Sequence, residues 1–293
     1  PAPEAEPQRA PAPAPVSELA TMEVPVVTPE GPTGNVEELF ARIRAGRADD
    51  EGEDSGPVPE LAAAVAVDPV ASENALETRD DLLENVEAGL TRALKRVLQD
   101  EQNEVLDRLR RVRQPSTAEV LPEQAVQLAA YREAALPWLQ QAARAGVGFM
   151  SDPVPGSEAE SHHPSLDGRA NDLAAELVEP LRTRLARALD DGAGEGDPSV
   201  VAESLRSTYR QVKVSQVEAV ARHHVVVAFS VGAYVATPQA ARLQWVVEDD
   251  GHCPDCDDNA LAGPTAKGQP FPTGQLHPPA HPGCRCLLVS VTA

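Results

Sequence analysis

The chain has 293 residues, with only 3% aromatic residues, 28 prolines and a formal net charge of −21. The acidic balance argues against nucleic acid as a partner. The longest apolar run, residues 225–235, is about half of the ~20 residues that span a bilayer. We therefore expect no membrane contact from this chain, no secretory signal and a cytoplasmic protein. The abundance of Ala, Val and Leu favours a mainly α-helical fold.

The N-terminal region, residues 1–73, is predicted to be a disordered acidic linker rich in proline and alanine. Residues 1–81 hold 18 acidic and 5 basic residues, so much of the charge is local. Within this region, residues 36–46 form a short island with Leu39, Phe40 and Ile43 at helical spacing. Two interpretations stay open for the island: a recognition helix that folds on a partner, or a transient helix.

Residues 74–150 are predicted to be a helical region, either a hairpin or a coiled-coil-like seam for self-association. Its apolar stripe is expected at 3-4 spacing on Leu83, Val86, Leu90, Ala93 and Val97. Pro115 should end the first helix. A second helix should start at Ser116 or Thr117 and run to about Ala145, with Gly146 as its cap and Pro137 kinking or dividing it.

Residues 151–168 are predicted to be a linker in which His162 and His163 are solvated. A third helix is expected over Arg169–Asp190 because leucines recur there at steps of four, with Pro180 bending it. The longest helix is expected at about Ser199–Tyr234, with a slip near Lys213. His223 and His224 on this helix are interpreted as core or surface histidines.

The C-terminal module, residues 243–293, is predicted to be a small antiparallel β element. Its strands are expected at Leu243–Val247 and Leu287–Val291, with Trp245 as the anchor of the module. Pairing these strands would bring together two cysteine pairs that lie in the loops between them.

All four cysteines of the chain lie in this module, as Cys253-Pro-Asp-Cys256 and Cys284-Arg-Cys286. Two short loops that each supply two soft ligands are typical of a structural zinc site. His281 is a further candidate ligand, so either four thiolates or three thiolates and His281 complete the site. Four protein ligands leave no open coordination position, which favours a structural Zn²⁺ over a catalytic one. His252 and His277 lie beside the cysteines.

Three other interpretations of the cysteines remain. In the first, disulfides join the two pairs in place of a metal. A thioredoxin-like redox site needs a helix directly after Cys253, whereas the acidic, broken sequence that follows predicts none. An HNH-type nuclease needs a catalytic histidine, with His277 or His281 as candidates, and a helix in the spacer. We expect no catalytic residue and no enzyme activity.

The terminal stretch resembles the phage Mu F-like minor head protein (phage head morphogenesis) domain. The resemblance covers roughly residues 169–293 and is carried by Trp245, Asp250, the C-x2-C unit and the closing P-P-A-H-P-G-C-R-C. An R-T-E-like element of that family is replaced here by Arg222-His223-His224. The resemblance implies a non-enzymatic minor capsid protein that contacts portal or capsid proteins in a procapsid or virion.

A second resemblance concerns the middle of the chain. Residues 92–112 and the island at 36–46 look similar to C-terminal portions of actinobacterial DivIVA-domain proteins. That family implies an alternative function as a coiled-coil scaffold in cell division or at the cell pole. In this alternative the protein partners are scaffold components, and the scaffold carries the C-terminal zinc module described above.

Overall fold

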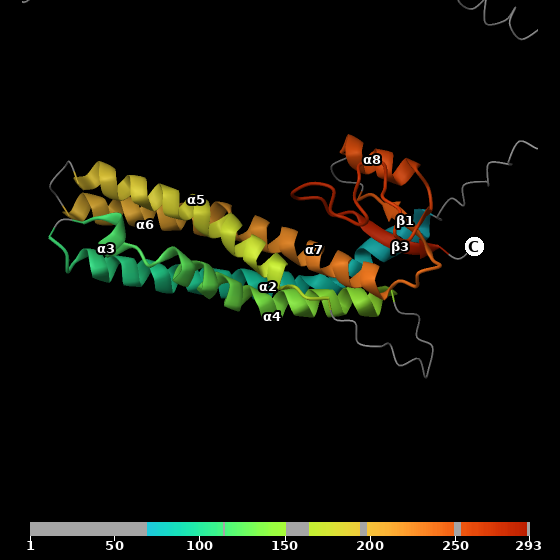
Figure 1. Ribbon diagram of the computed structural model, residues 1–293, viewed down its shortest axis with the longest axis horizontal. Helices are drawn as coiled ribbons and strands as arrows, with labels where there is room; N and C mark the ends of the chain where they lie inside the picture. The colour runs from blue at the N-terminus through green and yellow to red at the C-terminus, as the bar shows by residue number, and fades with distance from the viewer. Residues whose placement is uncertain (1–68, 114, 151–163, 194–197, 249–252, 292–293) are drawn as a thin grey trace, which may run out of the picture. The chain divides into compact units, whose positions relative to one another are not determined.

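The computed structural model describes residues 69–291 apart from residues 114, 151–163, 194–197 and 249–252. In chain order its elements are α2 (Pro69–Leu109), α3 (Thr117–Val120), α4 (Gln124–Met150), α5 (Asp167–Ala193), α6 (Pro198–Ser215), α7 (Val217–Ala236), β1 (Arg242–Val246), α8 (Pro254–Leu261), β2 (Thr265–Ala266) and β3 (Leu287–Val291) (Figure 1). The described chain is thus mainly helical with a small antiparallel sheet, as predicted. The island at 36–46, His162, His163 and His252 lie outside the described residues.

Helix α5 shows how the apolar spacing builds the core of the helical bundle. Its five leucines at steps of four are all buried: Leu173, Leu177, Leu181, Leu185 and Leu189. Residues four apart share one face of a helix, so this stripe meets the buried side chains of α2, α4, α6 and α7 in one core. Pro180 lies inside α5 without interrupting it. In Figure 1, α5 and α6 form one layer along the bundle, and α2 and α4 form the other.

Helix α2 buries a slightly different stripe from the predicted one. Leu83, Val86 and Leu90 are buried as expected, but the stripe continues through Leu94 and Leu98, while Ala93 and Val97 are only partly buried. The observed steps are close to the 3.6-residue period of a straight α-helix, whereas the predicted 3-4 steps belong to a supercoil. Packing in a bundle, rather than in a coiled-coil seam, therefore decides which side chains are buried.

Helix α4 runs past the residue expected to cap it. Gly146 lies inside the helix, which continues to Met150. A Cβ on Gly146 would lie 2.0 Å from the carbonyl oxygen of Phe229, and a Cβ on Gly232 would lie 2.0 Å from that of Ala143. Both glycines are therefore needed where α4 and α7 cross with their backbones in contact. The prediction that Gly146 caps α4 is therefore wrong. A glycine is required at this position by the close packing against α7 and not by the end of a helix. Pro137 does not divide α4.

Two predicted helices are each split in the structure. The helix expected from residue 116 to 145 is divided into α3, which Ser116 precedes as N-cap residue, and α4. The helix expected over Ser199–Tyr234 is divided at Gln216, whose φ of −120° and ψ of −44° leave the helical region. The longest described helix is instead α2, with 41 residues. By length and apolar composition α7 also passes for a membrane span, and 61% of its apolar window is buried inside the structure.

The sheet of the C-terminal module has the order β2-β1-β3. Strands β1 and β3 pair antiparallel, with Trp245 opposite Leu288, which confirms the two predicted strands. The short strand β2 on the other side of β1 was not anticipated. Pairing of β1 and β3 closes the 40-residue segment that holds the cysteines, because residues 247–286 form the connection between them.

A buried carboxylate lies in the middle of the bundle. Glu101 of α2 accepts hydrogen bonds from the Tyr209 hydroxyl at 2.7 Å and the Gln127 amide at 2.8 Å. The Arg182 guanidinium donates to the other end of the Gln127 amide at 3.1 Å. Burial raises the pKa of Glu101 above its usual value, although these hydrogen bonds oppose the shift.

The raised pKa of Glu101 predicts a pH dependence of stability with a defined sign. Between the unfolded and folded pKa values the folded chain holds a proton that the unfolded chain has lost, so the free energy of unfolding falls as pH rises. We expect Glu101→Gln to remove this contribution, because its amide is neutral at every pH and keeps an oxygen for Tyr209. Urea unfolding from pH 4.5, the ordinary pKa of the carboxyl, to neutral pH measures the difference.

The stability of Glu101→Gln relative to the natural chain should therefore increase with pH across this window. Glu104→Gln is the matched control, because Glu104 is exposed less than one turn further along α2. A relative stability of Glu101→Gln that stays constant with pH would contradict the assignment.

Candidate metal centre

The first turn of α8 positions two of the five predicted donors. Cys253 is the residue directly before the helix, and its carbonyl oxygen accepts the backbone N–H groups of Cys256 and Asp257 at 2.9 and 3.0 Å. Pro254 at the first helical position favours this start. The expectation that no helix follows the first cysteine is wrong. Negative charge is favourable at a helix N-terminus, so the acidic residues Asp255 and Asp257 support the helix.

The return segment supplies the other three donors. The backbone N–H of Cys284 donates to the carbonyl oxygen of His281 at 3.1 Å, which closes a turn. Gly283 in this turn has a φ of +80°, where a residue with a side chain would be strained. Cys286 follows directly before β3. The H-P-G-C-R-C sequence is thus a tight turn that leads into a strand of the sheet.

The structure brings all five predicted donors together. Cys253, Cys256 and His281 form one group whose ligand atoms lie within 4.8 Å of one another, and Cys256, Cys284 and Cys286 form a second such group. The Cys256 sulfur lies 3.4 Å from Nε2 of His281 and 3.7 Å from the Cys284 sulfur. All four cysteines are free. Cys256 therefore lies at the centre of a five-donor cluster that could hold a metal ion.

The surroundings of His281 fix which ring nitrogen faces the cluster. Its Nδ1 lies 2.9 Å from the carbonyl oxygen of Pro282, an acceptor, so we assign the ring proton to Nδ1. Nε2 then carries the lone pair and faces the Cys256 sulfur. This arrangement, with one nitrogen donating to a carbonyl and the other free to bind, is typical of metal-ligating histidines.

The thiols of the cluster differ in acidity. Hydrogen bonds from the Cys286 thiol and from the backbone N–H groups of Cys286 and Ala280 lower the pKa of Cys284 to about 5. Burial raises the pKa of Cys256 to about 12. The hydrogen bond that its thiol donates to Cys284, together with burial, raises the pKa of Cys286. A metal ion bound by Cys256 would therefore displace the proton of this thiol, which makes binding weaker at low pH.

An apolar shell surrounds the cluster. Leu243, Trp245, Phe271 and Leu288 are buried with Cys256, Cys284 and Cys286 in a second core, separate from that of the bundle. The rings of Trp245 and Phe271 meet nearly edge to face, with centroids 5.1 Å apart. The predicted role of Trp245 as an anchor of the module is confirmed. This small shell keeps three of the sulfurs away from water.

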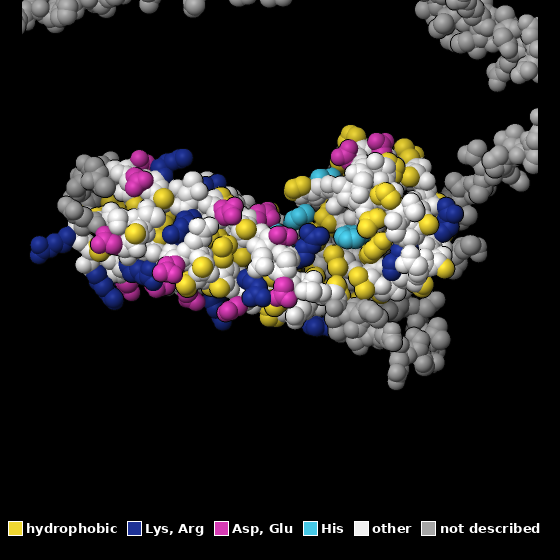
Figure 2. Space-filling model, in the orientation of Figure 1, with side chains coloured by type: hydrophobic (Ala, Val, Ile, Leu, Met, Phe, Trp, Pro, Cys, Tyr) yellow, Lys and Arg dark blue, Asp and Glu magenta, His cyan; other side chains and the backbone are white. Residues whose placement is uncertain are grey.

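The other described histidines lie outside the donor groups. His277 packs on the Tyr234 ring, with centroids 5.4 Å apart, and burial lowers its pKa. On α7, His224 is buried and its Nε2 lies 2.9 Å from a carboxylate oxygen of Glu176. His223 packs against His224 at 5.2 Å. Figure 2 shows histidine side chains gathered on one face, where the module meets the bundle.

Lys267 connects the module to the end of α7. Its ammonium group donates to the carbonyl oxygens of Val235 and Thr237 and lies 5.2 Å from the centre of the Tyr234 ring. The last carbonyls of a helix lack partners within the helix and carry partial negative charge, so a lysine there is favourable. Burial lowers the pKa of Lys267. The loop after β2 is thereby fixed to the C-terminal end of α7.

Sequence reasoning missed two arginines beside the cluster. Arg285 lies between two donors and forms ion pairs with α2, and Arg79 of α2 is completely buried beneath the same turn. The position of Arg285 between two candidate ligands was a sequence signal, because an arginine that is buried with such a site needs acidic partners. No sequence signal marked Arg79, since nothing nearby on α2 indicates that its helix passes under the C-terminal turn.

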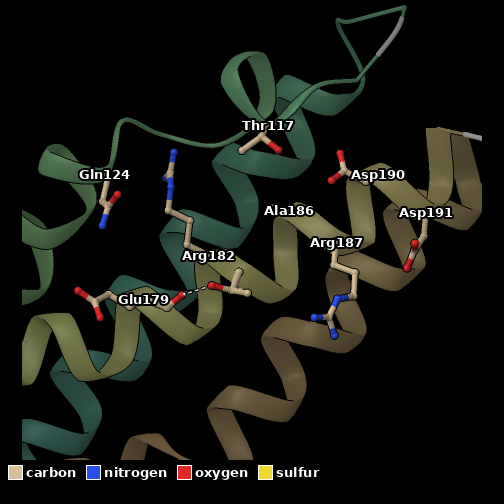
Figure 3. Close-up of a pocket in the computed structure, with 9 residues that line it drawn as sticks. Thr117, Gln124, Glu179, Arg182, Ala186, Arg187, Asp190 and Asp191 are labelled. Carbon is tan, nitrogen blue, oxygen red and sulfur yellow. Dashed lines mark hydrogen bonds between the residues drawn. The ribbon is translucent and has the colours of Figure 1, made fainter.

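A separate pocket lies in the helical bundle and is not lined by residues of the C-terminal module. It is lined by residues of α3, α4 and α5, namely Thr117, Gln124, Glu179, Arg182, Thr183, Ala186, Arg187, Asp190 and Asp191 (Figure 3). Its lining holds no cysteine or histidine and mixes acidic with basic side chains. One hydrogen bond within it, from the Thr183 hydroxyl to the Glu179 carbonyl, belongs to α5 itself. The pocket adds no donor to the metal centre.

Comparisons with family models, with curated proteins and with solved structures find no match for this chain. The interpretation of the cluster therefore rests on its donors and their geometry.

Proposed function

We propose that the cluster is a structural zinc site and that the chain is a non-enzymatic structural protein. The observation that carries the proposal is the position of Cys256, which belongs to both donor groups. A zinc ion beside Cys256 would join α8 to the turn before β3. The closed, largely sulfur donor set in an apolar shell supports structure rather than catalysis.

Measuring the zinc content of the purified chain tests the proposal. We expect about one zinc per chain by mass spectrometry under native, reducing conditions, since four donors suffice for one tetrahedral site. The chain should be purified both with and without reductant. Two disulfides and no zinc in both preparations would contradict the proposed zinc site.

The geometry favours His281 as the nitrogen ligand beside three thiolates. Its Nε2 lies in the same group as Cys253 and Cys256, and the Cys284 sulfur lies 3.7 Å from the Cys256 sulfur. Cys286 then remains a buried neighbour of the site. X-ray absorption at the zinc edge distinguishes the sets: one nitrogen and three sulfurs support this assignment, and four sulfurs assign the last position to Cys286 instead.

The role of this module in the cell is proposed from the resemblance to phage Mu F-like minor head proteins. A helical bundle with a metal-stapled module suits a component that binds other proteins during assembly, such as portal or capsid proteins. Portal and terminase genes beside the coding gene would support head assembly. A DivIVA-type membrane-binding part encoded ahead of Pro1 would instead support the cell-division or polar scaffold.

One observation favours a second candidate, a thiol redox enzyme. Cys253 precedes α8 directly, as the reactive cysteine does in thioredoxin-like sites. Against this candidate, the Cys256 sulfur lies 3.4 Å from Nε2 of His281 and 3.7 Å from the Cys284 sulfur, and such a cluster of donors favours a metal site. Disulfide reduction in insulin by the zinc-free chain with dithiothreitol tests it. A rate above that of dithiothreitol alone, lost in Cys253→Ser, would establish the enzyme.

A further inference from the structure

The turn between Cys284 and Cys286 contacts the N-terminal part of α2. Three acidic groups surround the Arg285 guanidinium: Asp80 at 2.6 Å and Glu87 at 3.2 Å on α2, and Glu248 at 3.4 Å after β1. Only a fifth of the Arg285 side chain is exposed, so these ion pairs are less screened than those of the bundle surface. Two residues that flank Arg285 are candidate metal ligands.

A second arginine completes this contact from the α2 side. The Arg79 side chain is fully buried, and its guanidinium donates to the carbonyl oxygen of Arg285 and to Asp80, the latter at 2.8 Å. Burying a guanidinium is costly unless it is paired. Arg79 therefore stays buried only while the turn holds the carbonyl group of Arg285 in place. We call the five residues Arg79, Asp80, Glu87, Glu248 and Arg285 the latch.

The apolar core holds α2 firmly only from residue 83 onward. Leu83, Val86 and Leu90 are buried in the core of the bundle. Ahead of them, Glu73, Asn74, Glu77 and Thr78 are exposed, and Ala75 and Leu76 are only partly buried. Residues 73–82 therefore depend on the latch for much of their attachment. This segment is also where residues 1–68 join the described part of the chain.

We propose that metal occupancy controls the attachment of residues 73–82, near the start of α2. The inference rests on the proposed zinc site. A bound ion fixes the Cys284–Cys286 turn and so holds Arg285 in position for Asp80 and Glu87. Without the ion the turn loses this constraint, Arg79 gains water, and residues 73–82 separate from the module while the rest of the bundle stays folded.

Hydrogen–deuterium exchange of the whole chain, with zinc and after chelation in reductant, tests the proposal. Removal of zinc should raise the exchange rate of backbone amides in residues 73–82 by about tenfold or more, the scale of losing one or two charge-assisted hydrogen bonds. Amides of residues 90–105 serve as an internal reference, since Leu90, Leu94, Leu98 and Val105 are buried in the bundle. Their exchange should not change.

Arg285→Gln separates the latch from the metal. The variant keeps all five donors, so its zinc content should equal that of the natural chain. Exchange in residues 73–82 should already be fast with zinc bound and should not increase on chelation. Asp80→Asn, at a partly exposed position that pairs with both latch arginines, should give a smaller effect of the same kind. Arg110→Gln, which breaks an exposed pair with Asp107 at the other end of α2, is the control and should change nothing.

The outcomes distinguish this inference from the proposed function. Absence of zinc from the natural chain would overturn both. Zinc that binds, with exchange in residues 73–82 unaffected by chelation, would overturn the inference alone. Loss of protection in residues 90–105 as well would also overturn it, because the ion would then support the whole fold.

Discussion

Replacing Cys256 with serine is expected to abolish zinc binding and to unfold the C-terminal module. Cys256 is the only described residue that belongs to both donor groups, so its loss leaves neither group with three donors. Structural zinc contributes on the order of 10 kcal/mol to small metal-bound modules. The second core holds only a few apolar side chains and cannot replace that contribution. Zinc per chain measures the first effect. Near-ultraviolet circular dichroism, in which the contribution of Trp245 should be lost and that of Trp138 in the bundle retained, measures the second.

Asp255→Asn is the matched control for this variant. Asp255 is exposed in the same turn of α8 and lies outside the two donor groups, so zinc content should be unchanged. The bundle should remain helical in Cys256→Ser, because its core consists almost entirely of helix residues, and the module adds only Val246 and Leu287 to its buried members. Zinc binding at full stoichiometry in Cys256→Ser would show that the site does not include this thiol.

Replacing Gly232 with valine is expected to destabilise the bundle by about 3 kcal/mol or more, the range of severe overpacking. The added Cβ would lie 2.0 Å from the carbonyl oxygen of Ala143, and a backbone atom cannot rotate away as a side chain does. Helices α4 and α7 must then separate, which opens the core along their full contact. Urea unfolding followed by far-ultraviolet circular dichroism measures the loss.

Gly148→Ala provides the control in the same region. Gly148 lies in α4, two residues after Gly146, and a Cβ there would meet nothing within 4 Å. Alanine should stabilise the helix by about 0.5–1 kcal/mol, because glycine loses more backbone entropy on folding. Equal effects of Gly232→Val and Gly148→Ala would contradict the close crossing of α4 and α7.

Local patterns in the sequence predicted most of the helices and the two long strands. The leucines of α5 and the strand around Trp245 are such patterns, since each depends on neighbours in sequence. The breaks were harder to predict. Gln216 carries no strong stop signal, whereas Pro122 follows directly after the cap of α3 and is a stop that the prediction of one continuous helix did not use. Gly146 resembled a cap in the sequence, but the residue that requires it, Phe229, lies 83 residues further along the chain.

The five donors were predicted from their spacing alone, and the structure brings them together. Helix α8 was missed because the acidic residues after Cys256 suggested a broken segment, whereas at a helix N-terminus they are favourable. The arginine pairs of the latch join residues about 200 apart in sequence, and such contacts leave no periodic pattern. These long-range polar contacts could therefore not be predicted from the sequence.

The lysine that binds the end of α7 also restricts the length of the chain around it. Successive residues of an α-helix turn by about 100°, so one residue inserted between Gly232 and Val235 would rotate the last carbonyls away from Lys267. The crossing at Gly232 prevents α7 from rotating to compensate. Insertions and deletions should thus be tolerated in the loops of the module far more readily than in this final turn.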